Sequence, residues 1–262
     1  MKLENLTGTK YIHTSDVHNL KAPSVIVPYL IQLFHPKSVV DVGCGLATFL
    51  AVFKENGVSD VLGIDGNWVE KGKLFVDQSE FKEADLEKEF RLQRNFDMVL
   101  CLEVAEHLKE ESADIIVGNL VSLGNVIVFS AAVPNQGGQN HLNEQSFSYW
   151  QKKFKKHSYS FYDIFREKFW NESDIDWWYK QNMFLIAHDS INLPEVVLKN
   201  KVEGEPLLFI HPDTLATRIS QLKTMTEQAE NMRAGNASVS FYLKGMKGKL
   251  FNSFKRVFGI KK

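Results

Sequence analysis

The stretch SVVDVGCGLATF at residues 38–49 is the feature that most constrains the fold. The β-branched run at residues 39–42 predicts a buried parallel strand. Gly43-Cys44-Gly45 predicts a tight turn in which the backbone can approach a ligand closely, because glycine has no Cβ. Residues 46–50 are compatible with the start of a helix. A strand, a glycine turn and a helix in this order predict a turn that binds a nucleotide-like cofactor.

Two positions in this stretch distinguish the cofactor classes. A dinucleotide fingerprint, G-x-G-x-x-G, has its third glycine where this chain has Thr48. Asp41, inside the strand, would repel a pyrophosphate but suits a cofactor whose nearby end carries an ammonium and a sulfonium. The pattern V-[DE]-x-G-x-G resembles motif I of the class I S-adenosylmethionine-dependent methyltransferases. The resemblance implies that five residues here bind this cofactor: Asp41, Gly43, Cys44, Gly45 and Thr48.

The ends of the next two expected strands supply further cofactor candidates. Residues 61–66 predict a short buried strand that ends at Asp65, with Gly66 after it. Asp65 lies about twenty residues after the glycine turn, the separation at which a carboxylate can accept hydrogen bonds from both ribose hydroxyls. In the methyltransferase pattern, Asp85 would accept from the adenine amine and Leu86 would pack on the adenine ring.

Residues 96–102 predict a fourth strand, which is followed by Glu103, Glu106 and His107. Because strand ends in an open α/β sheet point into the ligand crevice, we expect these side chains at the chemistry. The string FDMVLCLEVAEHL resembles motif IV of methyltransferases of the ubiquinone O-methyltransferase type. Glu103 is then a cofactor residue, and Glu106 and His107 are candidates for catalysis.

A divalent metal is the alternative role for the same three side chains. In some relatives, including small-RNA 2′-O-methyltransferases, the acids and the histidine of E-x-x-E-H bind a divalent cation. Such an ion could hold a substrate hydroxyl and lower its pKa. We predict no metal, with a divalent ion at Glu103, Glu106 and His107 as the alternative.

The polar loop at residues 131–144 follows a fifth expected strand at residues 125–130. A loop rich in Gly, Asn and Gln at a strand end is typical of a polar-ligand site, and amide side chains both donate to and accept from sugar hydroxyls. His141 is the candidate general base because histidine titrates in the useful range, and Asn143 is a further catalytic candidate. Alternatively, His141 orients the loop or the substrate, or binds a metal with His107.

Two further strands are expected at residues 160–166 and 181–187, with the last strand antiparallel. The motifs Q-G-G-x-x-H-x-N-E-Q-x-x-x-Y-W, D-x-x-R and W-W-Y-x-Q-N resemble bacterial methyltransferases of capsule, lipopolysaccharide and other glycan biosynthesis. This resemblance spans roughly residues 12–187 and implies an acceptor hydroxyl on a sugar or a nucleotide sugar.

The expected fold is a three-layer, Rossmann-like α/β domain over residues 1–190. This range includes an N-terminal helical arm. Its seven-stranded sheet would be mostly parallel, with an antiparallel last strand. A C-terminal helical extension with a basic amphipathic tail is expected over residues 191–262.

Charge is distributed unevenly along the chain. Residues 233–262 carry eight basic and no acidic side chains, whereas residues 1–232 carry 23 basic and 32 acidic ones, a net charge of −9. The acidic body argues against extended contact with a phosphate backbone, so nucleic acid is not an expected partner. The basic tail suits an anionic membrane surface or a partner in glycan assembly, with a disordered or dimer-forming tail as the alternative.

Cysteine use and hydropathy give the expected compartment. Cys44 and Cys101 are too few for a disulfide framework, and neither a signal-peptide pattern nor an apolar run of membrane length is present in the sequence. We therefore predict a cytoplasmic enzyme, with the tail at the inner membrane surface as an option; the sequence does not predict an oligomeric state.

The function predicted from these motifs is S-adenosylmethionine-dependent O-methylation of a sugar hydroxyl, with S-adenosylhomocysteine as the by-product. One alternative is a phenolic, quinone-type or ribose hydroxyl as the acceptor, with a metal. Another is a cofactor-binding scaffold without catalysis.

Overall fold

The computed structural model describes residues 19–235. The part of the expected N-terminal arm before residue 19 and the amphipathic tail after residue 235 lie outside the described residues and stay predictions, whereas the helix of that arm is present over Lys21–Phe34. The chain divides into two compact units, residues 1–211 and residues 212–262.

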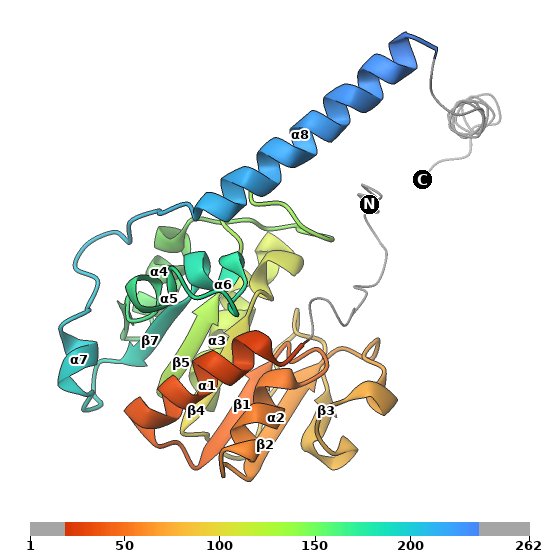
Figure 1. Cartoon of the computed structure of the whole chain (residues 1–262). Coiled ribbons are helices and arrows are strands. Elements are labelled where there is room, and N and C mark those ends of the chain that lie inside the picture. Colours follow the sequence, from red (N-terminus) through yellow and green to blue (C-terminus); the bar gives the residue numbers. More distant parts are fainter. Residues whose placement is uncertain (1–18, 236–262) are drawn as a thin grey trace. The chain divides into compact units, whose positions relative to one another are not determined.

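A seven-stranded sheet forms the centre of the first unit (Figure 1). Its order is β3-β2-β1-β4-β5-β7-β6, and β7 pairs antiparallel with both β5 and β6 while the other pairs are parallel. The predicted mostly parallel sheet with an antiparallel last strand is therefore confirmed. The strands are β1 (Ser38–Val42), β2 (Asp60–Asp65), β3 (Phe81–Glu83), β4 (Met98–Leu102), β5 (Val126–Ser130), β6 (Tyr159–Tyr162) and β7 (Phe184–His188).

Helices cover both faces of the sheet, which gives the predicted three layers. Successive residues of the central strands enter opposite cores: Met98 and Leu100 pack with α1 and α2, and Val99 packs with α3 and α4. The strands are apolar throughout because both faces are buried. The helices are α1 (Lys21–Phe34), α2 (Thr48–Glu55), α3 (Ala113–Leu123), α4 (Phe147–Lys155), α5 (Arg166–Phe169), α6 (Trp177–Asn182), α7 (Glu195–Leu198) and α8 (Pro212–Arg233), with short 3-10 turns η1 (Lys71–Lys73), η2 (Gln78–Glu80), η3 (Ala105–His107) and η4 (Glu110–Ser112).

The sixth strand ends earlier than expected from the sequence, and the seventh strand begins later. The sixth strand ends at Tyr162, so Asp163 and Arg166 lie beyond its carboxyl end. The seventh begins at Phe184, because the two residues Gln181 and Asn182 close the helix α6. Both differences place polar side chains at the carboxyl edge of the sheet instead of within a strand.

The first unit extends beyond residue 190, the boundary expected from the sequence. Asp163 N donates to Asn200 O at 2.9 Å, and His211 N donates to Gln181 Oε1 at 2.9 Å. Residues 191–211 are thus tied to the sheet domain by hydrogen bonds of their backbone groups to its backbone and to a side chain. The second unit contributes α8, a single helix of 22 residues. None of the helices within residues 19–235 combines the length and the apolar composition needed to cross a membrane.

Candidate active site

The glycine turn lies at the carboxyl end of β1 and leads into α2. Gly43 and Gly45 have φ angles of 82° and 53°, in the left-handed region that favours glycine. Gly43 N donates to Ile64 O at 2.7 Å, which fixes the turn to β2. A Cβ on Gly43 would lie 2.3 Å from Val104 Cγ2, so the turn also packs against the segment after β4. Only glycine fits at residue 43 without moving these neighbours.

Asp65, at the end of β2, is joined to the glycine turn by its carboxylate. Oδ2 accepts from Gly45 N at 2.8 Å, and Oδ1 accepts from Gly66 N at 2.6 Å. Burial raises the pKa of Asp65, and the two backbone N–H groups oppose that rise. Each carboxylate oxygen has capacity for a further hydrogen bond, so hydroxyl donors can still be accepted. The indole of Trp68 lies against Gly66, where a Cβ would be 2.2 Å from the ring.

Asp41 is buried in β1, where it lies opposite Gly63 and Leu100 in the neighbouring strands. Desolvation, with a smaller contribution from Asp65, raises the pKa of Asp41 to about 7. A bound cation would favour the ionised carboxylate, which agrees with the cationic cofactor expected from the sequence. Burial also raises the pKa of the Cys44 thiol, so that thiol stays neutral in the turn.

Three other predicted cofactor residues differ in exposure. Thr48, the first residue of α2, is buried. Leu86 is buried in the cluster that contains Val104. Asp85 is exposed: its carboxylate accepts from Glu87 N at 3.1 Å and pairs with Lys88 Nζ at 2.9 Å, and Lys88 is the main cause of its lowered pKa.

Glu103 follows β4 in a left-handed conformation, with φ of 56°, which is uncommon for a residue other than glycine. Its carboxylate oxygens accept from Asn182 Nδ2 at 3.1 and 3.3 Å, and Oε2 accepts from Gln136 Nε2 at 3.4 Å. Desolvation raises the pKa of Glu103, and the Asn182 hydrogen bond is the first of the contacts that oppose it.

The buried side chains of Gln136, Gln181 and Asn182 form an amide network around this carboxylate. Gln181 Nε2 donates to Gln136 Oε1 at 3.2 Å and to Asn182 Oδ1 at 3.1 Å. Asn182 Nδ2 also donates to Gln136 Oε1 at 2.9 Å. Gln136 belongs to the polar loop expected at a ligand, whereas Gln181 and Asn182 had no expected role, although they are the Q-N pair of the W-W-Y-x-Q-N motif.

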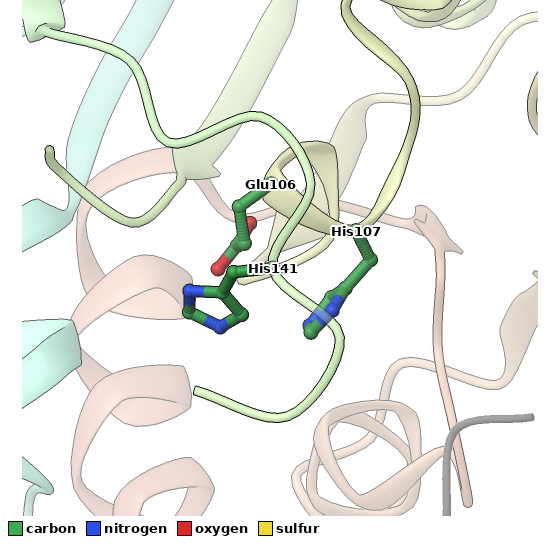
Figure 2. Close-up of side chains that lie close together, drawn as sticks. All are labelled: Glu106, His107 and His141. Carbon is green, nitrogen blue, oxygen red and sulfur yellow. The ribbon is translucent and has the colours of Figure 1, made fainter. Parts of the chain in front are cut away.

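Glu106, His107 and His141 come together beyond β4, and Figure 2 shows their side chains facing one another. One ligand-capable atom of each lies within 4.8 Å of the others. The His107 and His141 rings are edge to face, with centroids 4.9 Å apart. The main-chain oxygen of Glu106 accepts from Leu142 N at 2.8 Å and from Asn143 N at 3.0 Å, which holds the polar loop on η3.

Glu106 is fully buried, and neither of its carboxylate oxygens has a hydrogen-bond partner of ordinary geometry within residues 19–235. The groups acting on it are the Glu103 carboxyl and the backbone N–H groups of Glu106 and Ala132. Desolvation, followed by repulsion from Glu103, raises its pKa well above the ordinary value. Asn143 is also buried: its Oδ1 accepts from Gln145 Nε2 at 2.9 Å, and its Nδ2 has no partner in the described chain.

His141 and Glu144 form a dyad that was not among the expectations from the sequence. His141 Nδ1 lies 2.8 Å from Glu144 Oε1, which also accepts from Gly137 N. The ring packs on Gly138, where a Cβ would be 2.2 Å from Nε2. Because a carboxylate can only accept, Nδ1 carries the proton and Nε2 is the nitrogen that can accept one. The spacing of three residues between the histidine and the acid was the available signal.

Comparison with known proteins identifies the family to which the chain belongs. A family model described as "Methyltransferase domain" matches residues 18–184. No curated protein matched the chain. Similar solved structures include magnesium protoporphyrin IX methyltransferase (ChlM) from Synechocystis PCC 6803 with bound SAM, at 18% identity and a TM-score of 0.47 over 70% of this chain and 87% of that one.

Two further solved structures are similar to this chain. PKMT2 from Rickettsia typhi is 13% identical, with a TM-score of 0.49 over 68% of this chain and 54% of that one. DesVI from Streptomyces venezuelae is 19% identical, with a TM-score of 0.40 over 49% of this chain and 62% of that one. This chain therefore spans less than two thirds of the length of either protein.

The cofactor half of the site fits S-adenosylmethionine on its own geometry. A backbone cradle at Gly43 excludes any Cβ, a buried carboxyl at Asp41 suits a cation, and Asp65 retains acceptor capacity for hydroxyls. The family match covers more than half of the chain and includes all of these residues. The chain belongs to the methyltransferase domain family, and it is a class I methyltransferase that uses S-adenosylmethionine.

Proposed function

We propose that this methyltransferase acts on a hydroxyl of a sugar, in a nucleotide-linked sugar or a surface glycan. The observation that carries the proposal is the dyad of His141 and Glu144, with Nδ1 and Oε1 2.8 Å apart, in the polar loop beside β4 and β5. A hydroxyl must lose its proton when its oxygen is methylated, and an oriented histidine is suited to take that proton.

S-adenosylmethionine supplies a methyl group already activated on a sulfonium. The chain has to align the acceptor oxygen and remove its proton. In the proposed mechanism, Nε2 of His141 takes the hydroxyl proton as the oxygen acquires the methyl group. Glu144 keeps the ring oriented through Nδ1 and stabilises the imidazolium that forms.

The polar loop supports a sugar acceptor. Asn135 and Gln139 are exposed on it, and amide side chains can both donate to and accept from the many hydroxyls of a sugar. The net charge of −9 over residues 1–232 disfavours an extended nucleic-acid substrate. The resemblance of residues 12–187 to glycan-modifying methyltransferases favours the same class of acceptor.

The test is a transfer assay with the full-length protein and S-adenosylmethionine carrying a labelled methyl group. Neutral oligosaccharides and nucleotide sugars are supplied as acceptors, and products are identified by mass spectrometry. The proposal predicts label in an alkali-stable methyl ether on a sugar. Binding of S-adenosylhomocysteine by calorimetry, with no transfer to any hydroxyl, would contradict it and favour a non-catalytic scaffold.

A metal-assisted O-methylation of a phenolic, quinone-type or ribose hydroxyl is the second candidate. It is favoured by one observation, the convergence of Glu106, His107 and His141 around a carboxylate without ordinary hydrogen bonds. Carboxylate oxygen and imidazole nitrogen are suitable ligands for a first-row divalent ion, which could lower the pKa of a hydroxyl. Glu103 is not part of this group, because the amide network holds its carboxylate.

Chelation separates the two candidates. The general-base proposal expects full activity after treatment with EDTA and no stoichiometric metal in elemental analysis. Loss of activity that returns on addition of Mn²⁺ or another divalent ion would instead support the metal-assisted candidate. Glu106→Gln should then reduce metal content together with activity.

A further inference from the structure

A cavity of about 360 Å³ lies beyond the carboxyl end of β6. Both β5 and β6 pair antiparallel with β7, so β6 runs parallel to β5 and their carboxyl ends lie at the same edge of the sheet. The cavity therefore opens at the same edge of the sheet as the polar loop and the segment after β4. Its lining comes from α5 and from the segments that directly follow β6, α5 and α7 or precede α8: Asp163, Arg166, Glu167, Trp170, Asn200 and Phe209.

The centre of the lining is a fixed ion pair. The buried Arg166 donates from Nε and Nη2 to Asp163 Oδ2 at 2.8 and 2.6 Å, and from Nη1 to Leu207 O at 2.6 Å. Its guanidinium also lies 4.9 Å from the centroid of the Phe209 ring. The second oxygen of Asp163, Oδ1, has no hydrogen-bond partner within residues 19–235. The ion pair in the lining is thus held in place by contacts within the chain, and one buried carboxylate oxygen of the pair is left unsatisfied by the described residues.

The chemistry of the lining favours a neutral, hydroxyl-rich ligand. Arg166 is neutralised by Asp163, and the added carboxylate of Glu167 leaves the lining negatively charged, which disfavours a phosphate or a nucleotide diphosphate. Trp170 and Phe209 offer ring faces on which the C–H face of a pyranose can stack, and the carboxylates accept from hydroxyls. The volume lies within the range of about 300–1,000 Å³ typical of small-molecule sites.

Residues that line the cavity also contact residues next to the candidate active site. Phe147 lies 5.5 Å from the Arg166 guanidinium and begins α4 directly after the polar loop. His211 Nε2 lies 2.9 Å from Trp170 O, and His211 N donates to Gln181 of the amide network. Three strand spacings separate β6 from β4, so their carboxyl ends are about 14 Å apart. One sugar ring cannot span that separation, whereas a short oligosaccharide can.

We propose that this cavity binds a second sugar residue of the acceptor, distant from the hydroxyl that is methylated. The acceptor is then an oligosaccharide or a polymeric glycan, and neither a free monosaccharide nor a nucleotide sugar. This inference rests on the proposed function, and it selects one of the acceptor types that the proposed function allows.

The test measures kcat/KM for acceptors of increasing length. The probes are methyl hexosides of glucose, galactose, mannose and rhamnose, their di- and trisaccharides, and the matching nucleotide diphosphate hexoses. For the hexose that is methylated, the trisaccharide should be about tenfold better than the methyl hexoside. Trp170→Ala and the conservative Glu167→Gln should each lower that ratio to about twofold or less. Glu195→Gln, at an exposed glutamate of α7, should leave the ratio unchanged.

Two kinds of negative result are distinguishable. Equal kcat/KM for the methyl hexoside and the trisaccharide, a preference for the nucleotide sugar, or an unchanged ratio in both cavity variants would overturn the cavity inference while the proposed function stands. If no carbohydrate hydroxyl of any length takes the label, the proposed function fails and the inference fails with it. Thermal melting checks that each variant is folded.

Discussion

The two halves of the sheet's carboxyl edge are built differently. In the cofactor half, backbone groups make the contacts: Gly43 N bonds to β2, and Gly45 N bonds to Asp65, which lies 20 residues away in sequence. In the acceptor half, the part around Glu103 and the polar loop that we propose binds the acceptor, side chains make them, and Glu103, which the sequence assigned to the cofactor, is held by Asn182, which lies 79 residues away. The contacts of the first half thus join neighbouring segments of the chain, whereas those around Glu103 form only when distant segments are folded together.

The buried carboxyls of the two halves differ in the hydrogen-bond donors that they receive. Asp65 receives two backbone N–H donors, and Glu103 receives side-chain amides, so each buried acid is solvated by protein. Glu106 lacks such donors of ordinary geometry in the described residues, and its pKa is raised well above the ordinary value, mainly by desolvation. A buried carboxyl without donors marks a place where a ligand group is expected.

The largest expected effect is in the acceptor half. His141→Ala should lower kcat about 10³-fold, equivalent to about 4 kcal/mol, because the proton of the acceptor loses its base. Glu144→Gln keeps an oxygen for Nδ1 but removes the charge, so its loss should be smaller. Stopped assays give kcat, and calorimetry should show unchanged cofactor affinity in both variants. His157→Ala, at an exposed histidine after α4, is the matched control; turnover of His141→Ala equal to that control would remove His141 from the mechanism.

The next effect is in the cofactor half. Gly43→Ala should weaken S-adenosylhomocysteine binding about 100-fold, about 3 kcal/mol, because the residue has φ of 82° and the new methyl would meet Val104. Gly57→Ala is the control, since Gly57 has a similar φ of 90° but nothing within 4 Å of the added Cβ. Calorimetric Kd values for both variants show whether the loss is specific to the glycine turn. Equal Kd values would show that the conformation and close packing at Gly43 are unimportant for cofactor binding.

A smaller effect is expected on stability from the amide network. Asn182→Ala removes the Nδ2 group that donates to both oxygens of the Glu103 carboxylate and should reduce the free energy of unfolding by about 1–3 kcal/mol. Urea denaturation monitored by circular dichroism measures this change. Asn171→Ala, at an exposed residue after α5, provides the comparison. An unchanged midpoint for Asn182→Ala would mean that Gln136 alone satisfies the carboxylate.

The smallest effect is a pH dependence in the cofactor half. Since the pKa of Asp41 is raised to about 7, its ionised fraction grows as the pH rises from 6 to 8, and the affinity for the cationic cofactor should rise up to about tenfold. Asp41→Asn should flatten the dependence of cofactor affinity on pH. The control Asp174→Asn, at an exposed acid, should leave that dependence unchanged. Calorimetry at several pH values gives the Kd. A steep dependence retained in Asp41→Asn would assign the titration to another group.

The same raised pKa has the opposite consequence for the free protein. The unfolded chain releases the Asp41 proton near its ordinary value of 3.8, whereas the folded chain holds it until about pH 7. The free energy of unfolding should therefore fall as the pH rises between these values, and less so in Asp41→Asn.

Much of the fold followed from local patterns. The β-branched and apolar runs identified the strands other than β3, whose sequence, FKE, is mostly polar and was placed with the methyltransferase pattern. The sixth and seventh strands were displaced by a few residues, because Asp163 ends one and the pair Gln181 and Asn182 belongs to a helix. The start of α4 at Phe147 depends on Ser146, whose Oγ caps Tyr149 N at 3.3 Å. The sequence assigned residues 191–211 to the C-terminal extension, because it does not reveal their attachment to the sheet domain, which consists of hydrogen bonds to distant residues such as Arg166 and Gln181.

The sequence by itself determined the methyl donor, because most of the groups proposed to bind it lie between Asp41 and Gly66, and the others follow at the next strand ends. Only the tertiary structure decided which acids and histidines of different segments meet. It grouped both histidines with Glu106 and gave Glu103 to the amide network, whereas His141 and Glu144 are three residues apart in one loop. The physical reason is that the glycine turn depends on local backbone geometry and on hydrogen bonds to the next strand along the chain, whereas a site of buried side chains depends on packing between segments far apart in sequence.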